Sequence, residues 1–305
     1  MRPQAIVGRK CFVQQLRTIS RSSEHPAACG KVATRPSRVK LKSHLVEKPW
    51  GRTRLPEIFA TSSSHHPVGE IWFLGERDSP LLAKYLFTSE NLSVQVHPDD
   101  AQARARGFAR GKAECWFVLD AEPGARIGLG LRHQISAEHL RCAALDGSLE
   151  HLIDWRPVAP GDFYFVPPGT VHAIGAGISL LEFQQNSDVT YRLYEYGRRR
   201  SLHLDDGVAV AQCGRYPNHL FKRVDSATDA ILVDNPYFTL LHSHRDAMQD
   251  RQRWILPLDG HVVVDGEIGR PGECLLLAEH QRLDSVNGRL LIGAAPRANR
   301  AGLAA

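Results

Sequence analysis

Residues 161–172 read GDFYFVPPGTVH, and this stretch decides the fold. The aromatic and β-branched run from Phe163 to Val166 predicts a strand, and the Pro-Pro-Gly that follows predicts its end in a tight turn. His172 comes directly after that turn. The segment therefore predicts a β-strand whose end presents an imidazole, a side chain that binds metal ions.

The rest of the chain repeats this texture of short apolar runs separated by Gly and Pro. A helical pattern is confined to residues 99–107, 136–145 and 204–212. Such a pattern predicts a mainly β protein with a few short helices, built as two β domains in tandem. The other expected strands cover residues 70–74, 84–87, 92–96, 115–119, 178–183, 237–241, 254–256, 262–264 and 274–277.

Two further segments carry side chains that bind metals. In SVQVHPDD (residues 93–100), Gln95 and His97 are two positions apart and so share one face of a strand. In GKAECWF (residues 111–117), Lys112 and Glu114 do the same. With His172 these residues offer two imidazoles and two oxygen donors, a set that suits Zn²⁺ and also Mn²⁺, Fe²⁺ or Co²⁺.

Each of these residues also has an ordinary structural explanation. A histidine on a strand is more often part of a hydrogen-bonded core, and an inward Gln95 is more often a buried hydrogen-bonding group. Asp99 and Asp100 follow a proline and are interpreted as the start of a helix. Gln95, His97, Glu114 and His172 are the four remaining candidates. Their joint order and spacing favour a metal site over these separate explanations.

The combined motifs resemble a known family. The segment from Gly161 to His172 fits the cupin motif G-x5-P-x-G-x2-H, and Q-x-H-P-D followed by G-K-x-E is similar to type I mannose-6-phosphate isomerases in their short bacterial form. Further matches are EKPWG (residues 47–51), GEIW (69–72) and QNSDVTYRLY (185–194). The resemblance is specific from about Glu47 to Arg198 and looser beyond.

The resemblance implies a fold, an activity and a site. It implies two tandem cupin (jelly-roll β-barrel) domains, the first catalytic and the second degenerate, and one Zn²⁺ per chain. The reaction it implies interconverts mannose 6-phosphate and fructose 6-phosphate through a cis-enediol, for GDP-mannose synthesis or mannose use. It places the zinc ligands at Gln95, His97, Glu114 and His172, and the catalytic residues at Lys112, Glu182 and Arg192.

Several alternatives stay open at this point. Glu182 is the expected proton-transfer base, but it could instead orient Arg192 or Lys112. The substrate could be a related sugar or sugar phosphate, or the chain could be a sugar-binding cupin without activity. His242-Ser243-His244 has metal-ligand spacing, yet no Glu follows it at cupin spacing and Leu283 stands where a His would be needed. We therefore interpret the second barrel as degenerate.

Charge separates the chain into unequal parts. The first 44 residues carry ten Lys or Arg and one acid, whereas the remainder has 28 basic and 32 acidic residues. We expect residues 1–44 to be a disordered extension, 45–200 the metal-binding barrel, and 201–305 a linker helix with the second barrel. The mildly acidic body argues against nucleic-acid binding, and no stretch of about 20 apolar residues predicts a membrane span.

Cysteine usage bears on the compartment. The six cysteines are scattered and form no C-x-x-C pair. This pattern is typical of free thiols in a reducing compartment, so we expect a cytoplasmic protein. The resemblance implies that its partner is a small sugar phosphate. The sequence makes no prediction of oligomeric state.

Overall fold

The computed structural model describes residues 39–59, 66–76 and 78–296. Most of the predicted extension, residues 1–38, lies outside the described residues. Its predicted end at residue 44 is wrong, because strand β1 (Lys42–Arg52) begins at Lys42. Val39 is already buried and its carbonyl accepts a hydrogen bond from the Leu276 amide, so residues 39–44 belong to the folded part.

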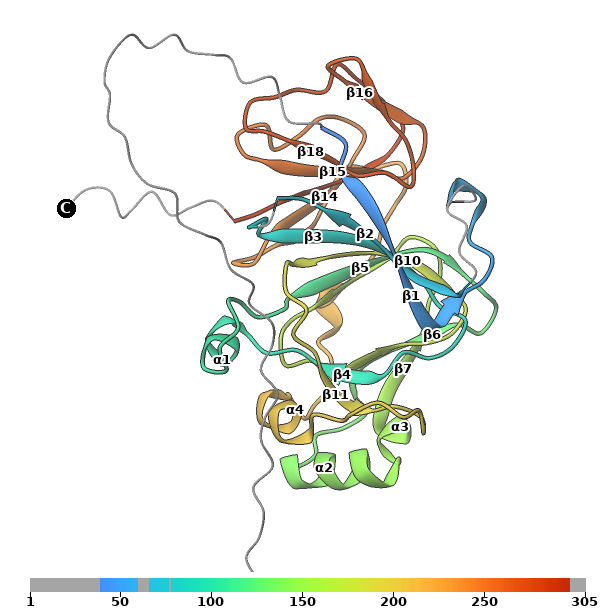
Figure 1. Cartoon of the computed structure of the whole chain (residues 1–305), viewed down its shortest axis with the longest axis vertical. Coiled ribbons are helices and arrows are strands. Elements are labelled where there is room, and N and C mark those ends of the chain that lie inside the picture. Colours follow the sequence, from blue (N-terminus) through green and yellow to red (C-terminus); the bar gives the residue numbers. More distant parts are fainter. Residues whose placement is uncertain (1–38, 60–65, 77, 297–305) are drawn as a thin grey trace, which may run out of the picture. The chain divides into compact units, whose positions relative to one another are not determined.

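The first part of the fold is built from two antiparallel sheets (Figure 1). The seven-stranded sheet has the order β1-β2-β3-β10-β5-β8-β12, and the five-stranded sheet has the order β11-β4-β9-β6-β7. Besides β1, their strands are β2 (Val68–Leu74), β3 (Leu81–Phe87), β4 (Val94–Val96), β5 (Glu114–Ala121), β6 (Arg126–Leu131), β7 (Ile153–Pro157), β8 (Asp162–Val166), β9 (His172–Ile174), β10 (Ile178–Gln185), β11 (Tyr191–Tyr194) and β12 (Phe221–Arg223).

The C-terminal part adds two smaller antiparallel sheets, with the orders β13-β14-β20-β15-β18 and β17-β16-β19. This architecture confirms the predicted mainly β class. The strands are β13 (Ala230–Asp234), β14 (Thr239–Ser243), β15 (Arg253–Pro257), β16 (His261–Val264), β17 (Glu267–Gly269), β18 (Leu275–Leu277), β19 (Ser285–Asn287) and β20 (Leu290–Ala294).

The helices are short, and three of them fall where the sequence predicts. They are α1 (Asp100–Arg104), α2 (Ala137–Asp146), α3 (Leu149–Leu152) and α4 (Leu204–Val210), with 3₁₀ turns at Glu57–Phe59 and Asn218–Leu220. Helix α1 starts as predicted, because the Asp99 side chain accepts from the Gln102 amide and the Gln102 side chain accepts from the Asp99 amide.

Side-chain alternation decides which face of the five-stranded sheet holds the site. On β4, Val94 and Val96 pack in one apolar cluster with Leu140 of α2 and Val210 of α4. Gln95 lies between these valines and so points to the opposite face. Helices α2 and α4 therefore cover the outer face, and the polar residues of this sheet face the barrel interior.

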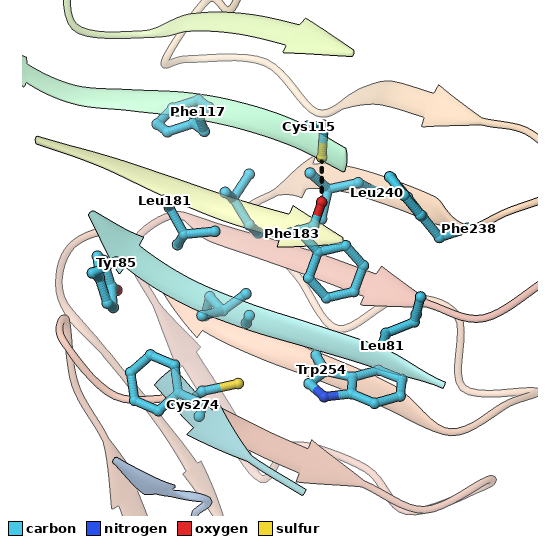
Figure 2. Packing of buried hydrophobic residues seen from close by; sticks show 14 of the residues in the cluster. Leu81, Tyr85, Cys115, Phe117, Leu181, Phe183, Phe238, Leu240, Trp254 and Cys274 are labelled. Atoms are coloured by element: carbon cyan, nitrogen blue, oxygen red, sulfur yellow. Dashed lines mark hydrogen bonds between the residues drawn. The ribbon is translucent and has the colours of Figure 1, made fainter. Parts of the chain in front are cut away.

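Strands β3, β8 and β10 of the seven-stranded sheet are buried on both faces. Phe183 of β10 points away from the first barrel and packs edge-to-face on Phe238 and on Trp254 of β15, with ring centroids 5.5 and 6.1 Å apart (Figure 2). The neighbouring Glu182 points into the first barrel. Alternate side chains of the seven-stranded sheet thus serve two purposes. One row packs in a core shared with the C-terminal sheets, and the other row faces the interior of the first barrel.

Truncation of Trp254 tests this shared core. The side chain is fully buried, so we expect Trp254→Ala to lower the free energy of unfolding by about 3–5 kcal/mol. Urea denaturation followed by circular dichroism measures the loss. The control is Ile231→Ala, at a side chain that is 60% exposed, for which we expect a change within about 0.5 kcal/mol. Equal effects of the two substitutions would contradict the shared core.

One negative finding concerns membranes. Within residues 39–59, 66–76 and 78–296, no helix is long and apolar enough to cross a bilayer.

Candidate metal centre and cavity

Strand register brings the predicted ligands to one place. On the five-stranded sheet, Gln95 of β4 lies directly opposite His172 of β9 on one side and Arg192 of β11 on the other. Residues paired in this way have Cβ atoms about 4.5–5.5 Å apart on the same face. A single row across the sheet therefore carries Arg192, Gln95 and His172.

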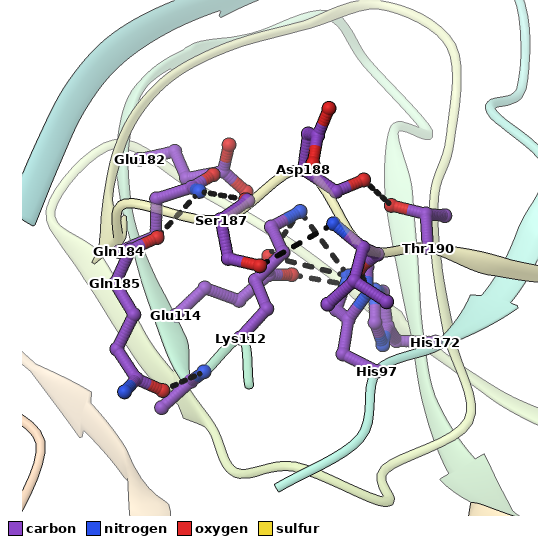
Figure 3. Close-up of polar contacts among 12 residues, drawn as sticks. His97, Lys112, Glu114, His172, Glu182, Gln184, Gln185, Ser187, Asp188 and Thr190 are labelled. Carbon is purple, nitrogen blue, oxygen red and sulfur yellow. Dashed lines mark hydrogen bonds and ion pairs between the residues drawn. The ribbon is translucent and has the colours of Figure 1, made fainter. Parts of the chain in front are cut away.

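Three of the predicted ligands form a compact buried group. The Nε2 atoms of His97 and His172 lie 3.4 and 3.3 Å from Oε2 and Oε1 of Glu114, so one carboxylate spans two imidazoles. The ligand atoms of the three residues lie within 4.8 Å of one another. All three side chains are at most 2% exposed (Figure 3).

Backbone carbonyls orient both imidazoles. Nδ1 of His97 lies 2.9 Å from the Val189 carbonyl, and Nδ1 of His172 lies 2.8 Å from the Thr170 carbonyl. Because a carbonyl only accepts, each Nδ1 is the protonated nitrogen and donates. Each Nε2 is therefore the unprotonated nitrogen, which is the form of histidine that binds a metal.

The donor set fits a metal ion by a further observation. Both carboxylate oxygens of Glu114 and Nε2 of His172 are buried and have no hydrogen-bond partner among the described residues. Buried polar atoms are rarely left without hydrogen bonds unless they serve another purpose. Two neutral imidazoles and a carboxylate, with Gln95 alongside, match the nitrogen and oxygen ligands that Zn²⁺ takes.

Lys112 lies against this group, as Figure 3 shows. Its Nζ is 2.9 Å from Glu114 Oε2 and 3.2 Å from His97 Nε2, to which it donates. Burial and, second to it, the Lys112 charge together lower the pKa of His97 to about 3. Burial alone would raise the pKa of Glu114, but Lys112 and then His97 bring it well below its usual range. The imidazole is therefore neutral and the carboxylate ionised.

A cavity of about 1020 Å³ opens beside the buried group. Gln95 and Lys112 line it, and so do the predicted catalytic residues Glu182 and Arg192. Its lining includes six cationic side chains and four carboxylates, an excess that favours an anionic ligand. The cations are Lys48, Lys84, Lys112, Arg106, Arg192 and Arg200, and the acids are Glu70, Glu182, Asp188 and Asp206.

Glu182 occupies the facing sheet. It lies opposite Lys84 of β3 and Trp116 of β5, and both of these donate to it at 3.2 Å, from Nζ and Nε1. Burial raises the pKa of the Glu182 carboxyl, and the Lys84 charge opposes the rise. Glu182 lines the cavity, and in the described part of the chain its ion-pair partner is Lys84. The alternative that it orients Arg192 or Lys112 finds no hydrogen bond or ion pair among these residues.

The sequence reasoning assigned no role to two charged residues of this cavity. Lys84 is 8% exposed and lies between Glu182 and Glu70, with Nζ 4.7 Å from the centre of the Trp72 ring. Glu70 pairs with Lys48 at 3.4 Å and also accepts from Trp72 Nε1. The sequence carries one indication of this pair. Lys84 stands inside the apolar run from Leu81 to Phe87, and a buried charge needs a partner of opposite charge.

Arg192 lies on the cavity wall beside Gln95. Its Nη1 donates to the Ser201 carbonyl at 3.3 Å, and its Nε lies 3.5 Å from Oε1 of Glu195. It is one strand from Gln95 and so separate from the His97 group. The structure thus places Arg192 in the same cavity as the metal-binding residues without direct contact to them.

The histidines of the C-terminal part do not form a second such group. Nδ1 of His242 contacts the Thr228 carbonyl at 2.9 Å, and His244 contacts Asp229 and the Ser226 carbonyl at 3.0 Å each. Among the residues that the structure describes, the group of His97, Glu114 and His172 is the sole cluster able to hold a metal.

Comparison with known sequences identifies relatives. No family model matches the chain. The sequence is 34% identical over 242 residues to the mannose-6-phosphate isomerase of Streptococcus mutans, a match that covers 66% of this chain and 76% of that protein. It is 39% identical over 171 residues to the mannose-6-phosphate isomerase ManA of Bacillus subtilis, covering 53% of this chain and 54% of that one.

Solved structures show the same architecture. The mannose 6-phosphate isomerase of Bacillus subtilis superposes with a TM-score of 0.73 at 26% identity, over 84% of this chain and 99% of that chain. A zinc-bound mannose 6-phosphate isomerase superposes with a TM-score of 0.64 at 16% identity, over 84% of this chain and 99% of the other. At that lower identity the likeness establishes the fold alone.

Proposed function

The chain belongs to the mannose-6-phosphate isomerase family, and from this premise we propose that it interconverts mannose 6-phosphate and fructose 6-phosphate. One observation carries the proposal. The buried group of His97, Glu114 and His172, with its unsatisfied acceptor atoms, adjoins a cavity with an excess of cations. That cavity offers a metal-binding end and a positively charged lining, as a sugar phosphate requires.

We propose that one Zn²⁺ per chain is held by His97, Glu114 and His172, with Gln95 as a further ligand. The paired register of Gln95 and His172 supports this assignment. When bound, the ion supplies a Lewis acid that polarises the sugar carbonyl. Nε2 of His172 and Oε1 of Glu114, which have no hydrogen-bond partner in the described part of the chain, support a role for these atoms as ligands.

The chain's own residues supply the remaining chemistry. Aldose–ketose isomerisation removes a proton from the carbon beside the carbonyl and returns it to the neighbouring carbon, through a cis-enediol. Glu182 takes and returns this proton, since it faces the cavity and its burial raises its pKa toward neutrality. Lys112 places a compact positive charge beside the reacting oxygens, and Arg192 offers a guanidinium fork.

The domain arrangement and compartment belong to the same proposal. We assign catalysis to the barrel of residues 45–200 and a structural role to residues 201–305. Four cysteines are free thiols in the described part of the chain: Cys115, Cys142, Cys213 and Cys274. Free thiols are typical of a reducing compartment, which supports a cytoplasmic enzyme acting on a small sugar phosphate.

A coupled assay for fructose 6-phosphate, with purified protein and mannose 6-phosphate, tests the function. We expect turnover that a chelator removes and that stoichiometric Zn²⁺ restores, because the proposed ligands all converge on one ion. Measured zinc content should follow activity through this cycle. A protein that holds zinc but gives no turnover would contradict the substrate assignment and would direct attention to other sugars or to a non-enzymatic sugar-binding role. Turnover unaffected by complete zinc removal would contradict the metal mechanism.

A further inference from the structure

Glu195 is a buried carboxylate that no step of the proposed reaction uses. It follows β11 directly and its side chain is 3% exposed. A carboxylate in such a position stays ionised only when cations surround it. Three arginines do so here, and two of them, Arg192 and Arg200, line the cavity.

The contacts of Glu195 divide between its two oxygens. Oε2 accepts from Nε of Arg198 at 3.1 Å, and Arg198 also donates to the Asn91 carbonyl at 2.8 Å, which anchors it outside the cavity. Oε1 lies 3.1 Å from Nη1 of Arg200 and 3.5 Å from Nε of Arg192. Oε2 thus binds Arg198 outside the cavity, and Oε1 contacts both arginines that line the cavity.

The Oε1 contacts leave donor capacity on the arginines. Oε1 is buried and accepts no aligned hydrogen bond among the described residues, so it holds the two guanidinium groups by charge. Nη2 of Arg192 has no hydrogen-bond partner in the described part of the chain. A guanidinium carries five N–H donors in a fixed fork, and the unused ones can bind a ligand in the cavity.

Backbone geometry brings these residues together. Tyr196 and Gly197 both have positive φ, 51° and 79°, so the chain reverses directly after Glu195. The returning segment runs back along β11, where the His203 amide donates to the Arg192 carbonyl and the Arg192 amide donates to Nδ1 of His203. A non-glycine residue in the left-handed region is strained, and such strain is concentrated at functional sites.

Charge pairing distinguishes this pair of arginines from the other cations of the cavity. Lys48 and Lys84 pair with cavity carboxylates, Lys112 pairs with Glu114, and Arg106 pairs with Asp206. Arg192 and Arg200 instead share the single carboxylate of Glu195 with Arg198, so that one negative charge serves three guanidinium groups. The unneutralised positive charge of the cavity is therefore concentrated at these two guanidinium groups.

We propose that Glu195 is a positioning residue that holds Arg192 and Arg200 as a paired site for the phosphate group of the substrate. The inference rests on the proposed function, because it takes a sugar phosphate as the ligand. Arg192 lies two strands from His172 along the row through Gln95, or about 10 Å at the usual strand spacing. That separation places the phosphate at the opposite end of a six-carbon sugar from the metal.

Two substitutions of Glu195 separate positioning from charge. Glu195→Asp keeps the charge but shortens the side chain, and Glu195→Gln keeps the length but removes the charge. If Glu195 positions the arginines, we expect both variants to raise KM for mannose 6-phosphate and Kd for inorganic phosphate about tenfold. This is the effect of losing one charge-assisted hydrogen bond from a displaced arginine to the phosphate. We expect kcat to stay within about twofold and zinc content to stay unchanged, because the metal and the base are elsewhere.

The control is Asp246→Asn, which removes another carboxylate paired with a buried arginine. Asp246 binds Arg253 at 2.8 Å in the C-terminal part, away from the cavity, so we expect lower stability with unchanged KM and phosphate affinity. Three results would overturn the role of Glu195: unchanged constants in both Glu195 variants, tighter phosphate binding in Glu195→Gln with Glu195→Asp unaffected, or equal losses in Asp246→Asn. Titration calorimetry with phosphate decides this even if the wild-type protein fails to isomerise mannose 6-phosphate, which would contradict the proposed function alone.

Discussion

His172→Ala abolishes stoichiometric zinc binding and lowers kcat/KM by about 10³-fold or more. The expected size follows from the several kcal/mol that a Lewis acid contributes to stabilising a developing oxyanion, since each 1.36 kcal/mol corresponds to a tenfold change in rate. His172 is fully buried, its tautomer is set by the Thr170 carbonyl, and its Nε2 has no other partner in the described chain.

The measurements are metal content by mass spectrometry, isomerase activity, and circular dichroism to show that the barrel is still folded. His133→Ala is the matched control, because His133 is exposed and lies outside the metal-binding group. It should keep both zinc and turnover. Retention of one zinc per chain and full activity in His172→Ala would remove His172 from the proposed ligand set.

Glu182→Gln lowers kcat by about 10²–10⁴-fold while KM changes little. Positioned general bases contribute this much. Glutamine preserves the size of the side chain, and its single carbonyl oxygen can still accept from one of the two donors of Glu182, Trp116 Nε1 or Lys84 Nζ. Metal content should not change, since Glu182 contacts none of the proposed ligands. Steady-state kinetics on zinc-loaded protein measure both constants.

The pH dependence provides a second readout for Glu182. A general base acts in its deprotonated form, so kcat/KM is retained above its pKa and falls as the pH decreases through it. Burial raises that pKa, so we expect the acid limb of wild-type activity at a higher pH than an exposed glutamate would give, and its absence in Glu182→Gln. Glu138→Gln, on the exposed face of α2, is the control. A raised KM with normal kcat would assign Glu182 to substrate binding.

Much of the first barrel is predictable because its local signals agree with its tertiary structure. Alternation on β4 predicts that Gln95 and His97 share a face. The structure agrees, because Val94 and Val96 pack on the opposite face in the apolar cluster under helices α2 and α4. The Pro-Pro-Gly turn correctly predicts where β8 ends and where His172 emerges. Helix α1 is predictable from Asp99, since an N-cap acts within its own turn.

Other parts depend on contacts that a sequence does not display. Strand β6 has the sequence RIGLGL, whose glycines obscure its strand pattern. Gly128 is needed because a Cβ there would approach Cγ2 of Ile153 to 2.5 Å, and Gly130 because it adopts φ +66°. Likewise, the pairing of Lys84 with Glu182 and of Glu195 with its arginines joins residues whose partners only the fold identifies.

Strands β3, β8 and β10 of the seven-stranded sheet are covered on both faces, and this limits how far the protein can be shortened. A fragment that stops after β12 would keep every proposed ligand, the base and the cavity arginines. It would also strip the cover from Phe183, Phe163 and Phe165, whose aromatic faces now lie in the shared core. An exposed aromatic surface of that kind promotes aggregation, so we expect the first barrel to need the C-terminal strands in order to stay soluble.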